Sequence, residues 1–493
     1  MPISDTPSYK PVYLWAVGYA LLWIIVSYSF DPTVPYDAVE ALNWGKNGEW
    51  GSPKNPWLVG AMMLPAIHIS GISLSFYWYF IHFIAIAIGI LGVWHLAFRL
   101  TGKKELAWLA MLTLNLSGII NFDIIPYNDN YLLIMLWPWT MLFFLRAVYD
   151  NPHWWLAFAL SSGLATMGKY STLALVGSVF LLTLFVPKVR QCYRQPALYI
   201  ALIIWFMLVL PNVWWLWNND FAAFKWVDSQ IDSGFNLHTT RSLLSVFYPL
   251  TIVGIIIYML GGRISWPKEQ PNQLVNIAIL LPLLIIYCWF SFNEGGRMTE
   301  WLQPFMSVSS ALLVGSITRF PQKSLRCTLQ GLTVVAILIW GGYVLIMVAN
   351  VRGAGHKFEG IKDFSWQLEQ RWHQLYPTPL HYVGGEYLHQ WLTFYAPSQP
   401  ETIQPWTLEG QAPNIYNRHV KESDIVRDGA ILVGTKGKTC EQEDFHRVLQ
   451  DWPKLRINST DEFVFQPEPE TQPTSVCVGF VSPEDFVSPE KYQ

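Results

Sequence analysis

The chain has 493 residues, of which 52 % are hydrophobic and only 14 % charged. Soluble proteins carry about 25 % charged residues, so the composition excludes an ordinary soluble enzyme, and its hydrophobicity excludes a disordered chain. The net charge of −3 at pH 7 gives no basic character suited to nucleic acid. The 26 Trp and 23 Tyr suit the aromatic belts of a membrane protein.

Charge is divided unevenly along the chain. Residues 1–350 hold 19 Lys and Arg against 15 Asp and Glu, whereas residues 351–493 hold 13 against 20. We therefore predict a transmembrane domain over 1–350 and a water-exposed domain over 351–493. The first apolar run is too long for the apolar core of a signal peptide and has no small-residue cleavage site, so no cleavable signal is evident.

Eleven apolar segments are predicted to span the bilayer, whose core needs roughly 20 apolar residues per helix. We treat 57–70 separately, as a helix lying in the outer interface, because a twelfth span there would place the basic residues after it on the wrong side of the membrane. The predicted spans are 11–29, 72–98, 105–120, 131–148, 154–168, 170–187, 197–217, 244–262, 274–292, 302–318 and 329–350.

The loop charges predict the orientation. With the N-terminus in the cytoplasm, 13 Lys and Arg of residues 1–350 fall on the inner side and 6 on the outer side, as the positive-inside rule requires. Residues 351–493 then lie outside. Eleven carboxylates also fall in the outer loops, where a simple membrane anchor has no need of them. We therefore predict a polar site at the outer membrane–water boundary.

The first outer loop is the richest in candidate catalytic groups. Asp37 and Glu40 are spaced i, i+3, so on a helix they share one face. A carboxylate at a partly dry interface can act as a general base, but Asp37 could equally cap a short interfacial helix. Lys54 is a compact cation suited to phosphate, or an interface lysine whose head reaches water.

The later outer loops add further candidates, each with a purely structural alternative. Asp129 can cap the helix that follows it, Lys169 can reach water at the interface, and Arg297 can pair locally with its neighbouring glutamates. The alternatives are a substrate-binding rim and cationic phosphate ligands, Arg being a good bidentate partner. The candidates of these loops are Asp123, Asn128, Asp129, Lys169, Tyr170, Asp220 and Arg297.

Several reaction classes lack any motif. There is no Walker loop, no GxGxxG after a strand, no GxSxG and no HExxH, and no Cys/His cluster offers a metal site. Ionisable groups are absent from the middle of the predicted spans, where ion-coupled transporters usually carry them. A lipid or solute transporter, or a flippase, stays the alternative hypothesis to an enzyme.

The outer-loop motifs resemble those of the GT-C superfamily of integral-membrane glycosyltransferases, and more narrowly the family 39/83 type that includes protein mannosyltransferases and the aminoarabinose and galacturonosyl transferases of lipid A. The similar segments, in order, are Asp37-Ala-Val-Glu40, Lys54-Asn-Pro-Trp-Leu58, Asn128-Asp-Asn-Tyr131, Gly168-Lys-Tyr-Ser171 and Pro211-Asn-Val-Trp-Trp215 followed by Asn219-Asp-Phe221. The sequence departs from the family where Ala38 replaces the second acid of an Asp-Glu pair.

The resemblance implies a fold, a reaction and roles. The fold is a mainly α, polytopic helix bundle with about 11 transmembrane helices and a small soluble α/β domain. Asp37, assisted by Glu40, is the catalytic carboxylate, and Lys54, Lys169 and Arg297 bind the donor phosphate. The donor is a polyprenyl-phosphate sugar, and the acceptor is lipid A, another envelope glycan or a protein. The enzyme is expected in the bacterial inner membrane, and the transfer is expected to invert the anomeric centre of the sugar. No tightly bound metal or other cofactor is expected, although a loosely held divalent cation stays open.

Residues 351–493 are predicted to form a small α/β domain. The segment 361–376 has amphipathic helical periodicity, 381–385 and 429–435 are typical of strands, and 386–395 is helical, which favours a short parallel or mixed sheet. The Pro- and Glu-rich segment from Pro467 is expected to be an extended tail. Cys440 and Cys477 lie on the predicted outer side, where a disulfide is allowed, but the sequence leaves their pairing open. We expect a lid or acceptor-docking role for this domain.

Overall fold

The computed structural model describes residues 9–31, 33–69, 71, 73–121, 128–229, 231–234, 238–294, 298–349, 360–403, 419–467 and 471–484. The chain forms two compact units. The first is built from the described parts of Met1–Phe30, Tyr79–Trp214 and Phe224–Ala354, and the second from those of Asp31–Trp78, Trp215–Ala223 and Gly355–Gln493.

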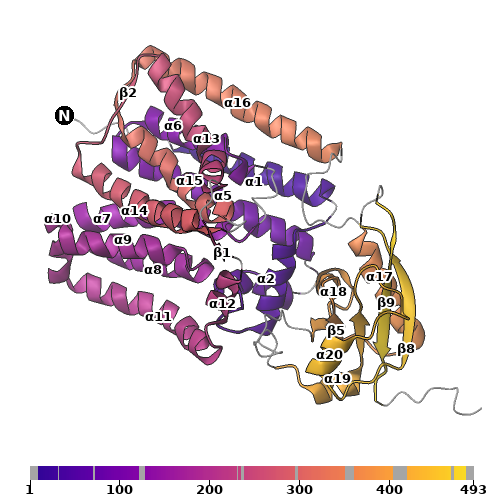
Figure 1. The fold of residues 1–493 in the computed structure, drawn as a ribbon. Helices are drawn as coiled ribbons and strands as arrows, with labels where there is room; N and C mark the ends of the chain where they lie inside the picture. Colours follow the sequence, from indigo (N-terminus) through magenta and orange to yellow (C-terminus); the bar gives the residue numbers. More distant parts are fainter. Residues whose placement is uncertain are drawn as a thin grey trace, which may run out of the picture. The chain divides into compact units, whose positions relative to one another are not determined.

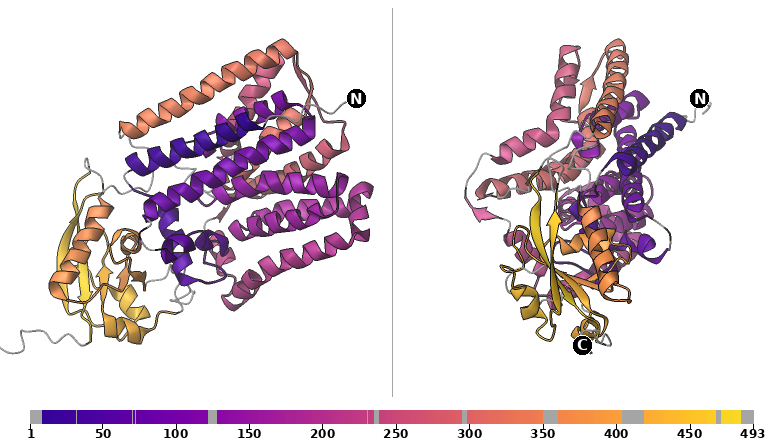
Figure 2. Two further views of the ribbon diagram at one scale, coloured as in Figure 1. Left: turned by 180° about the vertical axis from the view of Figure 1, so that it is seen from behind. Right: turned by 90° about the vertical axis from the view of Figure 1, so that its right-hand side faces the viewer.

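The first unit is a bundle of long helices, and α7, α8 and α9 pack side by side in it (Figures 1 and 2). Two short antiparallel ribbons, β1 with β3 and β2 with β4, join helix ends. The elements that lie wholly or largely in this unit are α1 (Lys10–Phe30), α5 (Leu74–Thr101), α6 (Lys104–Asn115), η1 (Gly118–Ile120), α7 (Tyr131–Tyr149), α8 (Trp154–Gly168), α9 (Thr172–Phe185), α10 (Pro187–Arg190), η3 (Gln191–Arg194), α11 (Pro196–Asn218), α12 (Ala222–Asp228), β1 (Asp232–Ser233), α13 (His238–Met259), β2 (Arg263–Ile264), α14 (Gln270–Phe292), β3 (Asn293–Glu294), α15 (Met298–Gly315), β4 (Ile317–Arg319) and α16 (Gln322–Val348).

Each of the eleven predicted spans overlaps a helix. Among the described residues, seven helices (α1, α5, α7, α11, α13, α14 and α16) are long and apolar enough to cross a bilayer, and α9 with the segment after it, bent by 90°, brings the number to eight. α6 and α8 have 12 and 15 residues, fewer than a straight span needs. The polytopic fold is thus confirmed, while the number of eleven transmembrane helices stays a prediction.

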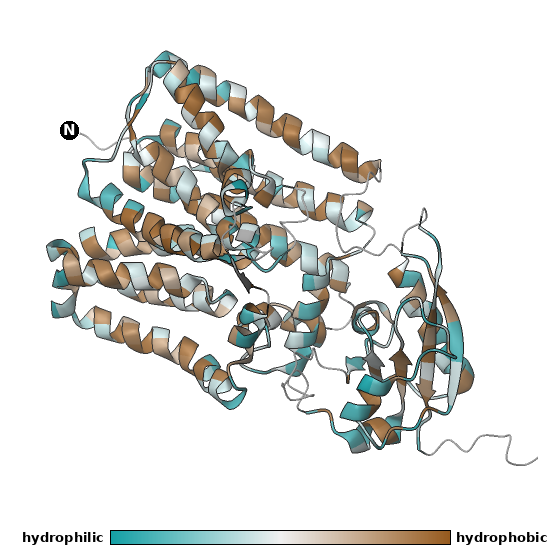
Figure 3. Ribbon diagram, in the orientation of Figure 1, coloured by the Kyte–Doolittle hydropathy of each residue, from teal (hydrophilic) through white to brown (hydrophobic). Residues whose placement is uncertain are grey.

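The apolar side chains of the bundle serve two purposes. Inside, aromatic residues pack in pairs, such as Trp23 stacked on Phe83 and Trp137 edge-on to Phe305 at a centroid distance of 4.8 Å. Outside, α11, α13 and α16 expose long rows of apolar side chains, including Met207 on α11 at 70 % exposure, and these helices are largely brown in Figure 3. Helices whose exposed faces are apolar are suited to contact with lipid, where every backbone polar group must be satisfied within the helix.

The second unit contains a five-stranded mixed sheet with the order β6-β5-β7-β9-β8. β5 is parallel to both β6 and β7, and β9 is antiparallel to both β7 and β8. The elements of this unit are α2 (Tyr36–Asn47), α3 (Leu58–Ala61), α4 (Leu64–His68), α17 (Ile361–Leu375), β5 (Tyr382–Gly385), α18 (His389–Tyr395), β6 (Glu401–Thr402), α19 (Glu422–Asp428), β7 (Ala430–Val433), α20 (His446–Asp451), β8 (Ser459–Phe465) and β9 (Thr474–Val481).

The predicted helices and strands of the α/β domain are confirmed. α17 buries Phe364, Leu368 and Trp372 on one side, and Phe364 packs against Phe465 of β8 with their ring centroids 5.3 Å apart. One prediction needs correction, because the segment predicted as an extended tail enters the sheet as β9. The run Val476–Val481 is almost continuously apolar and buried, which is typical of a strand that is covered on both faces.

Asp31–Trp78 packs against the C-terminal part of its own unit, more than 350 residues away along the chain. The backbone N–H of Val34 donates to the Tyr395 hydroxyl at 2.8 Å, and the Tyr36 hydroxyl donates to the side chain of Gln390. The Lys46 ammonium donates to the Pro400 carbonyl at 3.3 Å. The segment 57–70, predicted as one interfacial helix, forms the two short helices α3 and α4.

Candidate active site

The helix α2 carries the two carboxylates of the first loop. It begins after Pro35, whose fixed φ of −67° suits a helix start, and it ends at Gly48, whose φ of +66° closes the last turn through a bond from its N–H to the Trp44 carbonyl. Asp37 therefore lies within the first turn and is not the N-cap residue. Its charge is favourable there because the first turn carries the positive end of the helix dipole.

Asp37, Glu40 and Lys54 form an ion cluster, which we call the carboxylate–lysine cluster. The Lys54 ammonium lies 3.2 Å from Asp37 Oδ1 and 2.9 Å from Glu40 Oε2. The side chain of Glu40 is only 2 % exposed and that of Lys54 8 %, whereas that of Asp37 is 24 % exposed. The cluster thus offers one carboxylate to solvent, and that carboxylate is held by a buried cation.

Lys54 is placed by a tight turn. The Ser52 hydroxyl accepts the backbone N–H groups of Lys54 and Asn55, at 3.3 and 2.9 Å, and donates to the Asn55 carbonyl. α3 follows directly and packs against α2 at Gly45 and Gly60, where a Cβ added to Gly60 would lie 2.8 Å from the Gly45 nitrogen. Only glycine permits this approach, which fixes the lysine turn against the carboxylate helix.

Tyr387, in the segment before α18, interacts electrostatically with the carboxylate–lysine cluster. Its ring lies 4.7 Å from that of Tyr36 at the start of α2. Burial raises the pKa of Tyr387, and the charges of Glu40 and Asp37 raise it further, while Lys54 opposes them. The phenol therefore stays protonated and able to donate a hydrogen bond. Sequence patterns gave no signal for this residue, because it is distant in the chain and carries no motif.

A second ion pair lies in the helix bundle, at the start of α7. The Lys169 ammonium lies 2.8 Å from Asp129 Oδ1 and donates to Asn130 Oδ1 at 3.0 Å. The side chain of Asp129 is 3 % exposed and that of Lys169 11 %. Lys169 directly follows α8, and Gly168 brings that helix end against Leu132 of α7, so the close packing of the two helices sets the ion pair.

Amide groups extend this pair. The Asn130 amide donates to Gln303 Oε1 at 2.7 Å and to the Glu300 carbonyl, and Asn128 donates to the same Gln303 oxygen at 3.1 Å. Asn128 Oδ1 also accepts the Asn130 backbone N–H at 2.9 Å, in the turn just before α7. The N-cap residue of that helix is Asn130, so the capping alternative for Asp129 is not what the structure shows. Gln303, which is fully buried on α15, was not among the predicted site residues because a single amide in an apolar helix gives no sequence signal.

The other predicted site residues fall into two groups. Tyr170 belongs to the bundle, and its ring lies 5.5 Å from that of Phe224 on α12. Asp220 is exposed in the turn after α11, where its φ of +50° is left-handed. Asp123 and Arg297 lie outside the described residues. Asp220 belongs to the same unit as the carboxylate–lysine cluster, and Asp129, Lys169 and Tyr170 to the other.

Within the part of the chain that the structure describes, no group of three or more His, Cys, Asp or Glu side chains has an arrangement that could hold a metal ion. The carboxylate–lysine cluster has two carboxylates, but the Lys54 ammonium already occupies the position between them. The expectation of catalysis without a tightly bound metal stays a prediction.

The comparisons with known proteins agree with the predicted resemblance. A family model described as "dolichyl-phosphate-mannose-protein mannosyltransferase" matches residues 54–215. The chain is 24 % identical over 280 residues to the lipid A galacturonosyltransferase RgtD of Rhizobium johnstonii, an alignment that covers 54 % of this chain and 57 % of RgtD. The chain therefore spans little more than half the length of that relative.

Among solved structures, the crystal structure of ArnT from Cupriavidus metallidurans, determined with undecaprenyl phosphate bound, resembles the chain with a TM-score of 0.64 and 14 % identity. The likeness covers 96 % of this chain and 98 % of ArnT. It confirms the predicted fold class: a polytopic helix bundle of the GT-C type with a small α/β domain. The resemblance to GT-C glycosyltransferases that the motifs indicated is likewise confirmed.

Proposed function

We propose that the chain is a membrane glycosyltransferase that moves a sugar from a polyprenyl-phosphate carrier to an envelope acceptor. The observation that carries the proposal is the carboxylate–lysine cluster, in which Asp37 is partly exposed while its partners Lys54 and Glu40 are buried. The likeness to RgtD and ArnT supports the same reaction class. Lipid A is the acceptor we propose first, with other envelope glycans and proteins as the alternatives that a product analysis separates.

The proposed reaction is a direct displacement with inversion. An acceptor oxygen attacks the anomeric carbon of the donor sugar, and the bond from that carbon to the phosphate oxygen breaks. The electron pair leaves with the polyprenyl phosphate. A hydroxyl acceptor loses its proton to Asp37, which acts as the general base; a phosphate acceptor is already anionic, and Asp37 then orients it. Glu40 is a positioning residue, because it acts through Lys54.

Lys169 suits the donor phosphate. An ammonium has three N–H donors, and Asp129 and Asn130 accept two of them, which leaves a third for a phosphate oxygen. Stabilising the charge that develops on the leaving phosphate is typically a large part of catalysis. We assign the same role to Lys54 and, outside the described residues, to Arg297, with Asn128, Asp129, Tyr170, Asp123 and Asp220 as substrate contacts. The loops that carry these residues are predicted to face the periplasm, away from cytosolic nucleotide sugars, and a lipid-linked donor is therefore proposed.

The test is a transfer assay with the purified protein in nanodiscs, a synthetic polyprenyl-phosphate sugar and lipid A. We expect Asp37→Asn to lower the transfer rate at least one-hundredfold, since general-base catalysis contributes about 10²- to 10⁴-fold. Glu441→Gln, a matched change at an exposed acid of the same unit, should leave the rate unchanged. A folded Asp37→Asn protein with the wild-type rate refutes the assignment, and movement of intact donor across liposomes without product identifies a flippase instead.

A further inference from the structure

The helix α2 carries, beside the carboxylate–lysine cluster, an asparagine whose amide is unpaired. Asn43 is 8 % exposed, and among the described residues neither its Oδ1 nor its Nδ2 atom has a hydrogen-bond partner. A buried amide without partners is costly to the fold, because it gives up its hydrogen bonds to water. Buried polar groups are nearly always paired, so this amide has both a donor and an acceptor to offer a ligand.

The helical repeat places Asn43 relative to the cluster. Tyr36, Glu40 and Asn43 are spaced i, i+4, i+7 and therefore form one stripe along α2. Gly45, nine residues after Tyr36, lies on the opposite side of the helix, and that side packs against α3 at Gly60. Asn43 thus lies one turn beyond Glu40, about 4.5 Å further along the helix axis.

The stripe begins at an aromatic contact with the C-terminal part of the same unit. The ring of Tyr36 lies 4.7 Å from that of Tyr387 and 6.1 Å from that of Trp391. Tyr387 is 40 % exposed, so its ring and hydroxyl are accessible. A tyrosine has an apolar body and a polar tip, which suits a sugar, since a sugar ring carries both C–H groups and hydroxyls.

The other end of the stripe is polar and only partly satisfied. Asn47, the last residue of α2, follows Asn43 by four residues, and its buried Oδ1 atom has no hydrogen-bond partner within the described part of the chain. The neighbouring Lys46 ammonium, by contrast, donates to the Gln399 and Pro400 carbonyls at 2.5 and 3.3 Å. The packing of the unit therefore provides partners for the lysine but not for the two amides.

The two atoms of the Asn43 amide define the chemistry of a matching ligand. Nδ2 donates hydrogen bonds and Oδ1 accepts them. A phosphate or carboxylate group only accepts, and an ammonium group only donates, so each of them would meet one of the two atoms. A hydroxyl both donates and accepts, and a ligand with several hydroxyls meets the whole amide.

We propose that Asn43 is a substrate-binding residue that hydrogen-bonds the hydroxyls of a sugar held beside the carboxylate–lysine cluster. The inference rests on the proposed function, and the sugar is that of the donor or that of the acceptor. Asp37 and Asn43 are six residues apart, about 9 Å along the helix axis, so the amide contacts hydroxyls away from the reacting carbon. It contributes to recognition of the sugar and not to the chemical step.

The test is a calorimetric titration of the full chain in nanodiscs. The probes are undecaprenyl phosphate, its conjugates with glucose, galactose and arabinose, and lipid A. We expect Asn43→Leu to weaken the binding of at least one sugar-bearing probe about tenfold, which corresponds to about 1.4 kcal/mol, and to leave the affinity for bare undecaprenyl phosphate unchanged. A loss confined to the conjugates identifies the donor sugar, and a loss confined to lipid A identifies the acceptor.

The melting temperature separates binding from structure. Asn43→Leu removes an unpaired amide, loses no hydrogen bond and introduces a better helix former, so its melting temperature should equal or exceed that of the wild type. Asn458→Leu is the matched control, because Asn458 is exposed and its Oδ1 accepts the Ser482 N–H at 2.8 Å. This control should lower the melting temperature and leave every affinity unchanged. Asn43→Ala, which adds no bulk, decides the question if the leucine variant does not fold.

Three results overturn the inference: no binding of any sugar-bearing probe to the wild type, unchanged affinity for all of them in both Asn43 variants, or an equal loss for undecaprenyl phosphate. A melting temperature lowered in both variants would show a structural amide and also overturns it. Wild-type transfer by variants that bind sugars normally contradicts the inference alone. Selective loss of sugar binding in a protein whose wild type transfers no sugar contradicts the proposed function alone.

Discussion

The Lys54 ammonium and the Glu40 carboxylate lie 2.9 Å apart, and the side chains of both are at least nine-tenths buried. Removing Lys54 takes the cation away from the buried Glu40 carboxylate, and such a loss typically costs about 3–5 kcal/mol, whereas removing Glu40 leaves Lys54 paired with Asp37 at 3.2 Å. We expect Lys54→Met to lower the free energy of unfolding by that amount and to abolish transfer.

The double variant Lys54→Met/Glu40→Gln separates charge from packing. It should recover most of the stability, because no unpaired charge stays buried, but it should not recover transfer. Chemical denaturation of the three proteins in detergent measures the first effect, and the transfer assay the second. Equal stability of Lys54→Met and wild type would show that the pair contributes nothing to the fold.

Lys169 provides the test of donor recognition. Lys169→Met should raise the apparent KM for the polyprenyl-phosphate sugar about tenfold or more, because a charge-assisted bond to the phosphate is lost. The exposed Lys323 of α16 is the matched control, and Lys323→Met should leave the donor KM unchanged. An unaltered KM in a folded Lys169→Met protein removes the lysine from the donor site and leaves it only its ion pair with Asp129.

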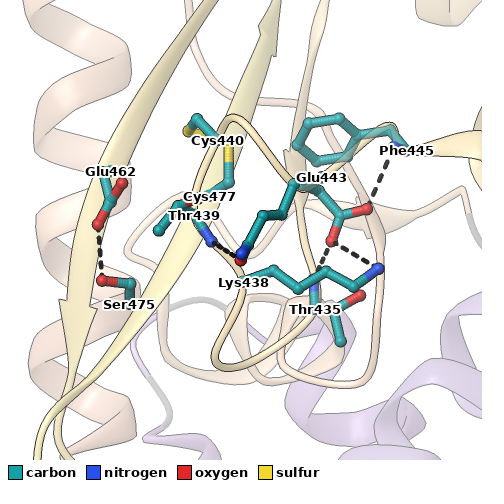
Figure 4. Close-up of a disulfide and its surroundings, with 10 residues drawn as sticks. Thr435, Lys438, Thr439, Cys440, Glu443, Phe445, Glu462, Ser475 and Cys477 are labelled. Carbon is teal, nitrogen blue, oxygen red and sulfur yellow. Dashed lines mark hydrogen bonds and ion pairs between the residues drawn. A yellow bond between two sulfur atoms is a disulfide. The ribbon is translucent and has the colours of Figure 1, made fainter.

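Cys440 is bonded to Cys477 of β9, so the pairing that the sequence left open is present (Figure 4). The disulfide closes a loop of 37 residues, for which chain entropy predicts a stabilisation of about 4 kcal/mol. We expect reduction, or the Cys440→Ser variant, to destabilise the α/β domain by an amount in the range of about 2–4 kcal/mol. Thermal unfolding with and without a reductant measures this effect. Cys192, which is buried in the bundle, is a free cysteine, so the reductant does not alter it.

The Glu401–His419 pair should make stability depend on pH. Its N–O distance is 2.8 Å, the hydrogen bond raises the pKa of His419, and the same bond lowers the pKa of Glu401. The histidine contribution is complete below about pH 6.5 and is lost as pH rises through its folded pKa; the glutamate contribution is present above about pH 4.5 and is lost as pH falls through its folded pKa.

The pair therefore stabilises the fold most between about pH 4.5 and 6.5. His419→Gln should lower the melting temperature there and have little effect at pH 8.5. Both side chains are more than a third exposed, so we expect a contribution of about 0.2–1 kcal/mol, as for other exposed pairs. A melting-temperature difference that does not vary with pH would contradict this account.

Metal dependence has a simple test. With the cation position between Asp37 and Glu40 occupied by Lys54, we expect transfer to persist in excess EDTA at an undiminished rate. Loss of activity in EDTA, and its recovery with Mg²⁺ or Mn²⁺, would show that a divalent ion takes part. Binding of the donor phosphate could then no longer be assigned to lysine alone.

Local patterns predicted the helices and most of the α/β domain, because apolar runs and periodicity act over neighbouring residues. The sequence spacing also placed Asp37 and Glu40 on one helix face. What it did not predict are contacts made by distant segments: Lys54 inserted between the two acids, Tyr387 coupled to them, and Gln303 bonded to Asn130. Such contacts depend on tertiary packing, and single polar residues carry no periodic signal for it.

β9 was also missed, because proline and glutamate in the preceding segment suggested a tail. Six of its residues are buried, and it pairs with both β7 and β8. β7 and β8 are therefore not joined by hydrogen bonds until β9, the last of the described strands in chain order, lies between them. During synthesis, β7 keeps an open edge until residue 481 has been made and delivered to the compartment where the domain folds, so a chain interrupted before Thr474 would leave that edge available to aggregation or to a protease.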